Sequence, residues 1–157
     1  MGGPGACCTH AQIVYNGCSP GAVQSCEIGT INLESLGTHI LLDLRECDGT
    51  RLDDLDFIQT TLVESARLAQ ATIVGHTFHK FSPQGVTGVV AIAESHICIH
   101  TWPEYNYAAV DIFTCGETVD PQFIAEYISE NLGSRDPHIR QLSRGFSNTT
   151  TTAPSHA

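Results

Sequence analysis

Apolar and polar positions alternate or run together in blocks that predict β-strands through the middle of the chain. Blocks rich in Val, Ile, Leu, Thr and aromatic residues, bounded by Gly, Pro, Asn or Asp, occupy residues 37–44, 71–81, 85–93, 95–102 and 106–115. This composition and these boundaries are typical of strands. A sixth, short strand is expected at 138–142. The block at 85–93 is nearly all small or β-branched, which predicts a strand buried on both faces.

Two segments have helical spacing instead. Over 52–68 the apolar residues recur at intervals of three and four, after acidic residues that suit the first turn of a helix. A second helix is expected from Asp120, which suits an N-cap, with Pro121 at the first helical position. Its predicted apolar face comprises Phe123, Ile124, Tyr127, Ile128 and Leu132. Both helices are amphipathic and should pack on a sheet through one face.

These elements follow one another in the order β-α-β-β-β-β-α-β. The short connections between the middle strands require antiparallel pairing. We therefore predict an α+β protein, a two-layer sandwich in which helices cover one face of an antiparallel sheet. The other face of such a sheet needs cover as well, and a second subunit is the natural candidate.

The two ends of the chain lack a sustained hydrophobic period. Residues 1–35 are rich in Gly, Cys and Ser, and residues 146–157 are a polar run of Ser, Thr and Asn. We interpret them as a poorly ordered leader and a disordered tail. The folded domain is expected to comprise 36–145, a length that supports one core and no more.

Charge and cysteine content narrow the functional classes. The formal net charge is -10, from 17 acids against 7 Lys and Arg. That balance argues against binding to nucleic acid or to an anionic membrane. No apolar run has transmembrane length, the N-terminus lacks the features of a signal peptide, and the 7 cysteines show no disulfide framework. We expect a cytoplasmic protein with reduced thiols.

The candidate chemistry is concentrated between residues 85 and 117. Glu94, Ser95 and His96 are consecutive polar residues at the junction of two apolar strands, where polar side chains need partners. A strained turn at this junction would place the Ser95 hydroxyl against the preceding carbonyl, with nearby donors to stabilise an oxyanion. That is the geometry of an N-to-O acyl shift. His100 follows on the same strand and Cys115 ends the next one.

The segment AESHICIHTWPEYNYAAVDIFTCG resembles the signature region of the prokaryotic pyruvoyl-dependent S-adenosylmethionine decarboxylase proenzymes. The resemblance extends upstream through LGTHILLDLREC and ATIVGHTFHKFSPQGVTGVV, and downstream through ETVDP. It covers roughly residues 36–145. Such a long match, with its Trp, Pro, His and Cys in register, is highly specific.

The resemblance implies a zymogen that cuts itself between Glu94 and Ser95 and converts Ser95 into a pyruvoyl group. The pyruvoyl ketone forms a Schiff base with the substrate amine and acts as electron sink for loss of carbon dioxide. The implied enzyme is a carboxy-lyase whose product, decarboxylated S-adenosylmethionine, is the aminopropyl donor for spermidine synthesis. The resemblance also implies a homodimer with its sites at or near the subunit interface.

Individual roles are carried over from the family position by position. His100 matches the processing histidine, and Cys115 the residue that returns a proton to the substrate. Thr87 stands where the family usually has Ser, whose hydroxyl polarises the Glu94 carbonyl, so processing is expected to be slower without being lost. The positions implied for substrate binding are Glu104 at the ribose hydroxyls, Phe81 at the adenine, and Ile97 and Trp102 in the pocket.

Three alternatives remain open on the sequence. His96, Cys98 and His100 share a strand face and are possible zinc ligands, although H-x-C-x-H is an uncommon zinc spacing, and we predict no metal. The same pyruvoyl chemistry serves relatives that act on arginine or ornithine. The last alternative is an uncut relative that serves as a regulatory partner. The intact Glu94-Ser95, His100 and Cys115 argue against it.

Overall fold

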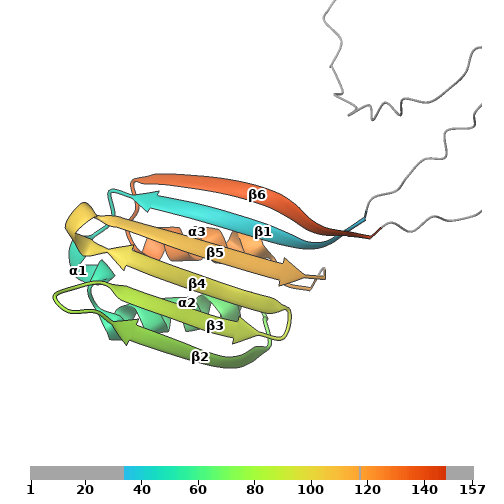
Figure 1. The fold of residues 1–157 in the computed structure, drawn as a ribbon, viewed down its shortest axis with the longest axis horizontal. Coiled ribbons are helices and arrows are strands. Elements are labelled where there is room, and N and C mark those ends of the chain that lie inside the picture. The colour runs from blue at the N-terminus through green and yellow to red at the C-terminus, as the bar shows by residue number, and fades with distance from the viewer. Residues whose placement is uncertain (1–33, 117, 148–157) are drawn as a thin grey trace, which may run out of the picture. The chain divides into compact units, whose positions relative to one another are not determined.

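A computed structural model describes residues 34–116 and 118–147. Within them one six-stranded sheet has the strand order β2-β3-β4-β5-β1-β6, and every neighbouring pair is antiparallel (Figure 1). The predicted antiparallel sheet is therefore confirmed. Its strands are β1 (Glu34–Arg45), β2 (Ile73–Lys80), β3 (Val86–Ile92), β4 (Ser95–Trp102), β5 (Tyr107–Cys115) and β6 (Asp136–Ser147).

Helices cover one face of the sheet. Figure 1 shows α2 (Leu55–Leu68) and α3 (Pro121–Asn131) side by side behind the strands, while the face toward the viewer carries no helix. A one-turn helix, α1 (Gly49–Leu52), and a 3-10 turn, η1 (Pro103–Tyr105), lie at one end of the sheet. The two-layer α+β sandwich is thus confirmed. We call the uncovered side of the sheet the open face.

The core lies between the sheet and the two long helices. Alternate residues of β3, β4, β5 and β1 point toward the helices and are almost completely buried. They meet the apolar stripes of α2 and α3 predicted from the 3.6-residue period. Each fully buried Leu or Ile contributes about 1.5–3 kcal/mol of transfer free energy. The largest of these side chains are Ile40, Leu42, Leu44, Leu52, Ile58, Leu62, Ile97, Ile99, Ile112, Ile124, Ile128 and Leu132.

The helical predictions need two corrections. The helix predicted over 52–68 is interrupted, because Asp54 accepts a hydrogen bond from the Phe57 N–H and caps a new helix that begins at Leu55. In α3, Asp120 caps the helix as predicted, but Phe123 is 39% exposed, so the buried stripe is narrower than the sequence indicated.

The strand predictions were too short at both ends of the domain. β6 spans Asp136–Ser147 instead of 138–142, because it pairs with β1 along nearly its whole length. β1 begins at Glu34, so the folded part extends past both boundaries of the predicted 36–145 domain. The rest of the predicted leader and tail lies outside the described residues. The prediction that β3 is buried on both faces was wrong: only its helix face is fully buried, since no helix covers the open face.

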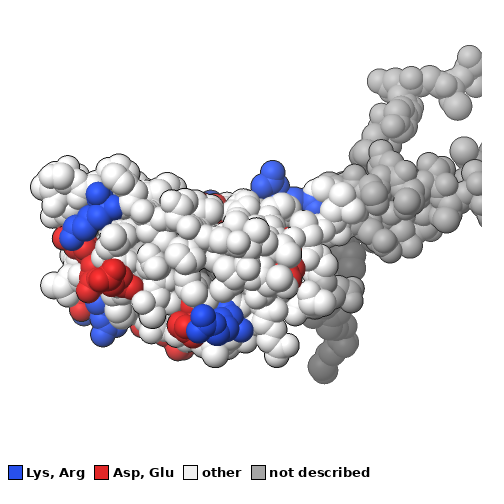
Figure 2. All heavy atoms as spheres, turned by 90° about the horizontal axis from the view of Figure 1, so that it is seen from below, with Lys and Arg blue, Asp and Glu red and all other residues white. Residues whose placement is uncertain are grey.

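Charged residues do not gather into a basic surface on the side shown in Figure 2. There most of the Lys and Arg side chains lie next to Asp and Glu in small mixed groups, a separate blue group lies at the upper edge, and uncharged surface separates the groups. None of the described helices is long and apolar enough to cross a membrane.

Candidate active site

Ser95 occupies a strained backbone conformation at the start of β4. Its φ angle is +149°, in a region that residues with a side chain rarely adopt. Such a conformation costs of the order of 1–3 kcal/mol and persists only where surrounding contacts enforce it. The two-residue connection between β3 and β4 enforces it here, because the strands pair right up to the Ile92–Ser95 rung. The predicted strained turn is therefore present.

Neighbouring strands hold the peptide that precedes Ser95. The backbone N–H of Cys115 donates to the Glu94 carbonyl oxygen at 2.9 Å. The backbone N–H of Thr72 lies 3.2 Å from a carboxylate oxygen of Glu94, and the Thr72 carbonyl accepts from the Ala93 N–H at 2.8 Å. Glu94 is thus fixed from both sides. A donor aimed at its carbonyl oxygen is an element of an oxyanion hole for attack at that carbon.

Two further contacts place chemistry at this end of β4. The Ser95 hydroxyl lies 3.2 Å from Nδ1 of His96. The side chain of Cys115 lies over Gly37 of β1, so that a Cβ built on Gly37 would sit 3.1 Å from the Cys115 sulfur. The sequence placed His96 beside Ser95, but it did not identify Gly37 or the Cys115 N–H as contributors, because strand pairing brings these two to the site. We call this group the Ser95 end.

The opposite end of β4 holds a pocket of about 340 Å³, within the size range of small-molecule sites. Thr87 and His100 face each other across β3 and β4, with 2.8 Å between the threonine Oγ1 and the histidine Nδ1. Five of the predicted site residues line this pocket, and we call this group the pocket end. They are Phe81, Thr87, His100, Trp102 and Glu104. The pocket is lined by Phe81, Gln84, Thr87, His100, Thr101, Trp102 and Glu104.

Gln84 is a pocket residue that sequence reasoning missed. Its side-chain amide donates to a carboxylate oxygen of Glu104 at 3.0 Å and so restrains the carboxylate within the pocket. The sequence showed only a Ser-Pro-Gln-Gly turn at this point. Asp53 anchors that turn, accepting from the Gly85 N–H at 2.9 Å while lying 3.2 Å from the Lys80 ammonium.

The two ends of β4 do not meet within the chain. Ser95 and His100 are five residues apart on one extended strand, a separation of about 16 Å. Ser95, Glu94 and Cys115 are therefore together at one end, and the pocket residues are together at the other. No described contact joins the two groups.

Strand alternation corrects the expectation for Ile97. Its side chain is fully buried on the helix face, so it belongs to the core and not to the pocket. His96, Cys98 and His100 do share the open face, yet the described residues contain no group of three or more His, Cys, Asp or Glu side chains arranged to hold a metal ion. The pKa of the Cys98 thiol is raised, mainly by burial and to a smaller extent by the Asp111 carboxylate. The raised pKa disfavours the thiolate form that metals bind.

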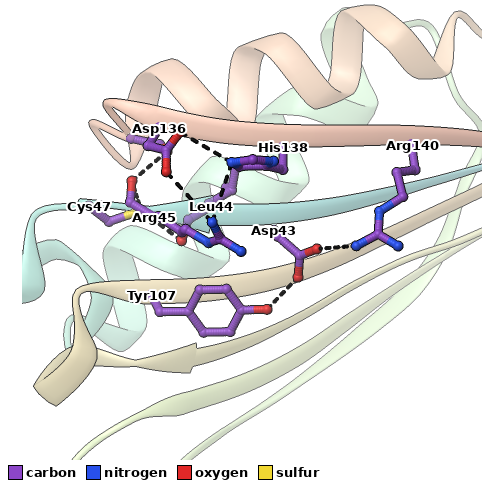
Figure 3. Close-up of polar contacts among 9 residues, drawn as sticks. Asp43, Leu44, Arg45, Cys47, Tyr107, Asp136, His138 and Arg140 are labelled. Atoms are coloured by element: carbon purple, nitrogen blue, oxygen red, sulfur yellow. Dashed lines mark hydrogen bonds and ion pairs between the residues drawn. The ribbon is translucent and has the colours of Figure 1, made fainter.

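A polar network continues from the pocket across the open face. The Trp102 ring lies 5.5 Å from that of Tyr107, whose hydroxyl donates to Asp43 at 2.5 Å. Asp43 also pairs with Arg140 at 3.2 Å, and Figure 3 shows both partners converging on its carboxylate. The pKa of Asp43 is lowered mainly by the Tyr107 hydrogen bond and to a smaller extent by the positive charge of Arg140. Burial and the same hydrogen bond raise the pKa of Tyr107 to about 12.

We expect Tyr107→Phe to lower the free energy of unfolding at neutral pH by about 1–2 kcal/mol, the range for a partly exposed hydrogen bond to a charged group. Because the folded-state pKa is raised from 10.0 to about 12, the contribution of Tyr107 is complete below pH 10.0 and is lost as the pH rises to about 12. Urea unfolding at neutral pH and near pH 12 should show the difference between wild type and variant disappearing at the higher pH.

Tyr105→Phe is the matched control, since Tyr105 is 74% exposed. Both measurements are made on chains in which Ser95 is also alanine, so that self-cleavage does not complicate unfolding. Equal urea midpoints for the two tyrosine variants at neutral pH would show that the Asp43 hydrogen bond adds nothing to stability.

The fold and this geometry define an α+β protein with a serine-centred site at a tight strand connection and a separate small-molecule pocket. The family model of S-adenosylmethionine decarboxylase matches residues 38–145. The chain belongs to the S-adenosylmethionine decarboxylase family.

Individual relatives support this family assignment. The S-adenosylmethionine decarboxylase proenzyme of Thermodesulfovibrio yellowstonii is 50% identical over 112 residues, which cover 71% of this chain and 83% of the relative. The proenzyme of Pseudomonas paraeruginosa is 48% identical over 125 residues, which cover 80% of this chain and 77% of the relative. The crystal structure of the adenosylmethionine decarboxylase from Aquifex aeolicus matches with a TM-score of 0.72 and 34% identity, covering 76% of this chain and 99% of that one.

Proposed function

We propose that this protein is a proenzyme that cuts itself between Glu94 and Ser95 and then decarboxylates S-adenosylmethionine. The main support for this proposal is the peptide bond between Glu94 and Ser95. Ser95 has a strained backbone, and the Glu94 carbonyl already accepts a hydrogen bond from the Cys115 N–H. Family membership and the names of the relatives support the substrate. Those names all refer to S-adenosylmethionine, and nothing in them favours arginine or ornithine.

The proposed cleavage begins with attack of the Ser95 hydroxyl oxygen on the Glu94 carbonyl carbon. His96 Nδ1, 3.2 Å away, is placed to take the hydroxyl proton when its ring is in the acceptor tautomer. The Cys115 N–H stabilises the oxyanion, and the peptide nitrogen leaves with a proton to give an ester. The step also breaks the peptide bond that holds Ser95 at its unfavourable φ angle, so backbone strain favours it.

In the second stage a base removes the Cα proton of residue 95, and the ester oxygen leaves Cβ as the Glu94 carboxylate. Tautomerisation and hydrolysis then release ammonia and leave a pyruvoyl group. This base is proposed to be His100, whose Nδ1 is held by the Thr87 hydroxyl. Thr87 retains the hydroxyl of the serine that the family usually has, so it can serve as hydrogen-bond partner.

The residues at the Ser95 end fit a pyruvoyl group. Once formed, this group supplies an electron sink for the electrons left when carbon dioxide departs. The Cys115 thiol lies on the neighbouring strand beside Gly37, whose missing side chain leaves room for the sulfur and for the Phe113 ring, and this thiol is proposed to return a proton to the substrate carbon. In the pocket, Glu104 offers the ribose hydroxyls a carboxylate that Gln84 restrains, and Phe81 and Trp102 offer aromatic faces to the adenine.

A homodimer is proposed because one protomer separates the two half-sites. A symmetric dimer that packs the two open faces together with their strands reversed brings the Ser95 end of each subunit onto the pocket end of the other. The open face offers aromatic and aliphatic surface for such a contact, including Trp102 and Leu142. His100 would then act on the Ser95 of the partner, and Glu104 would bind the substrate held there.

An intact mass spectrum of the purified protein tests the proposed function. We expect two chains whose cleavage lies between residues 94 and 95, with the second chain carrying pyruvoyl in place of serine. Adding S-adenosylmethionine with borohydride should increase the mass of that second chain by one reduced amine adduct. Arginine and ornithine, offered in competition, should give far less adduct. A single uncut chain from native expression would refute the proposal.

A further inference from the structure

The charge partners of the basic side chains single out Arg144. All 7 Lys and Arg residues of the chain lie in the part that the structure describes. Six of them have a carboxylate oxygen within 4.0 Å, in the pairs Arg45–Asp136, Arg51–Asp48, Arg67–Glu64, Lys80–Asp53, Arg135–Glu46 and Arg140–Asp43. Arg144 has no such partner among the described residues. Its positive charge on the open face therefore needs an explanation.

Two side chains hold the Arg144 guanidinium. One of its nitrogens lies 3.2 Å from Nδ1 of His39, and its central carbon lies 5.3 Å from the centre of the Phe113 ring. Arginine has no acceptor, so it donates to Nδ1, which leaves the ring proton of His39 on the buried Nε2. Nε2 lies 3.4 Å from Asp111 without making a hydrogen bond. The guanidinium thus rests on an aromatic face with donors left over.

Arg144 also lies beside the Ser95 end. On the open face Cys115, Gly37 and Arg144 occupy one rung across β5, β1 and β6, about two strand spacings or 10 Å between the outer Cα atoms. Phe113, which the guanidinium covers, is on the same strand as Cys115. Gly37 contributes no side chain between them, and a Cβ there would lie 2.8 Å from the Phe113 ring and 3.1 Å from the Cys115 sulfur. The Phe113 ring, on which the guanidinium rests, and the Cys115 sulfur therefore share the space above Gly37.

We propose that Arg144, positioned by His39 and Phe113, binds the α-carboxylate of the substrate next to Cys115. The inference rests on the proposed function and adds the group that recognises the substrate as an amino acid. A carboxylate is the only anionic group of S-adenosylmethionine, and the planar guanidinium matches its two oxygens. The contact would also orient the bond that breaks.

The contact has a distinct consequence for kinetics. It exists while the carboxylate carries its charge and is lost when neutral carbon dioxide leaves, so it stabilises bound substrate at least as much as the transition state. Removing it should raise KM more than it lowers kcat. The product has no carboxylate and should bind equally well with or without Arg144.

Arg144→Gln and Arg67→Gln form a matched pair, because each removes one positive charge and Arg67 lies on the far surface of α2. For each processed enzyme we would measure KM and kcat for S-adenosylmethionine, and inhibition constants for decarboxylated S-adenosylmethionine and for the methyl ester of the substrate. Arg144→Gln should raise KM about 10-fold or more, as loss of a charge-assisted contact implies. Both inhibition constants should stay within about twofold. Arg67→Gln should change none of these values, and Arg144→Lys should fall between wild type and Arg144→Gln.

Equal weakening of substrate and product by Arg144→Gln, or no change in KM, would overturn the inference. If Arg144→Gln remains uncut, Arg144→Lys decides by the same comparison: a raised KM with an unchanged product constant supports the carboxylate contact, and any other pattern contradicts it. Failure of the proposed function itself would appear earlier, as a wild-type chain that releases no carbon dioxide from S-adenosylmethionine.

Discussion

Replacing Ser95 by alanine is expected to leave a folded, uncut chain with no measurable decarboxylase activity. Without the hydroxyl there is no nucleophile for the Glu94 carbonyl, so neither the cut nor the pyruvoyl group can form. The rate should fall by about a million-fold or more, toward the uncatalysed value. Intact mass and release of labelled carbon dioxide from S-adenosylmethionine measure the two consequences separately.

Ser143→Ala is the matched control, since Ser143 is an exposed strand serine outside both half-sites. It should be cut and active like the wild type. Circular dichroism of both variants establishes that they fold. Full activity of the Ser95→Ala chain would rule out the serine-derived cofactor and with it the proposed mechanism.

The second large effect is restoration of activity by mixing two inactive chains. Ser95→Ala keeps the pocket end intact, and His100→Ala keeps the Ser95 end intact. If each site combines the two ends across a symmetric dimer, a mixed dimer contains one complete site. Random pairing makes half of the dimers mixed, so co-expression should restore about one quarter of wild-type activity. Only the His100→Ala chain should be cut.

Co-expression of Ser95→Ala with Cys115→Ala is the control, because both changes fall on the Ser95 end and no pairing assembles a complete site. That mixture should be far less active than the first one. Differently tagged chains allow the mixed dimers to be purified and assayed by themselves. If purified mixed dimers of the Ser95→Ala and His100→Ala chains remain uncut, the shared site is wrong, and His100 must reach Ser95 within its own protomer.

The tertiary structure decided the features that depend on which strands are neighbours. The Cys115 N–H reaches the Glu94 carbonyl only because β5 pairs with β4, and Gly37 and Arg144 reach the same region only because β1 and β6 follow β5 in the sheet. Sequence spacing carries no information about such pairings. It also gave no sign that Gln84 restrains Glu104. It misplaced Ile97 as well, because the face of the sheet to which Ile97 points is known only once the strand register is known.

The sequence by itself determined the element types, because hydrophobic periods of two and of 3.6 residues follow from the local geometry of strands and helices. It also determined the Glu94-Ser95 connection as the centre of the chemistry, since consecutive polar residues between two apolar strands need a local reason. The sequence alone did not show that the predicted site residues fall into two groups, about 16 Å apart along β4. That separation follows from the extended strand, whose residues cannot approach one another, and it is the physical reason why a second subunit is expected to complete the site.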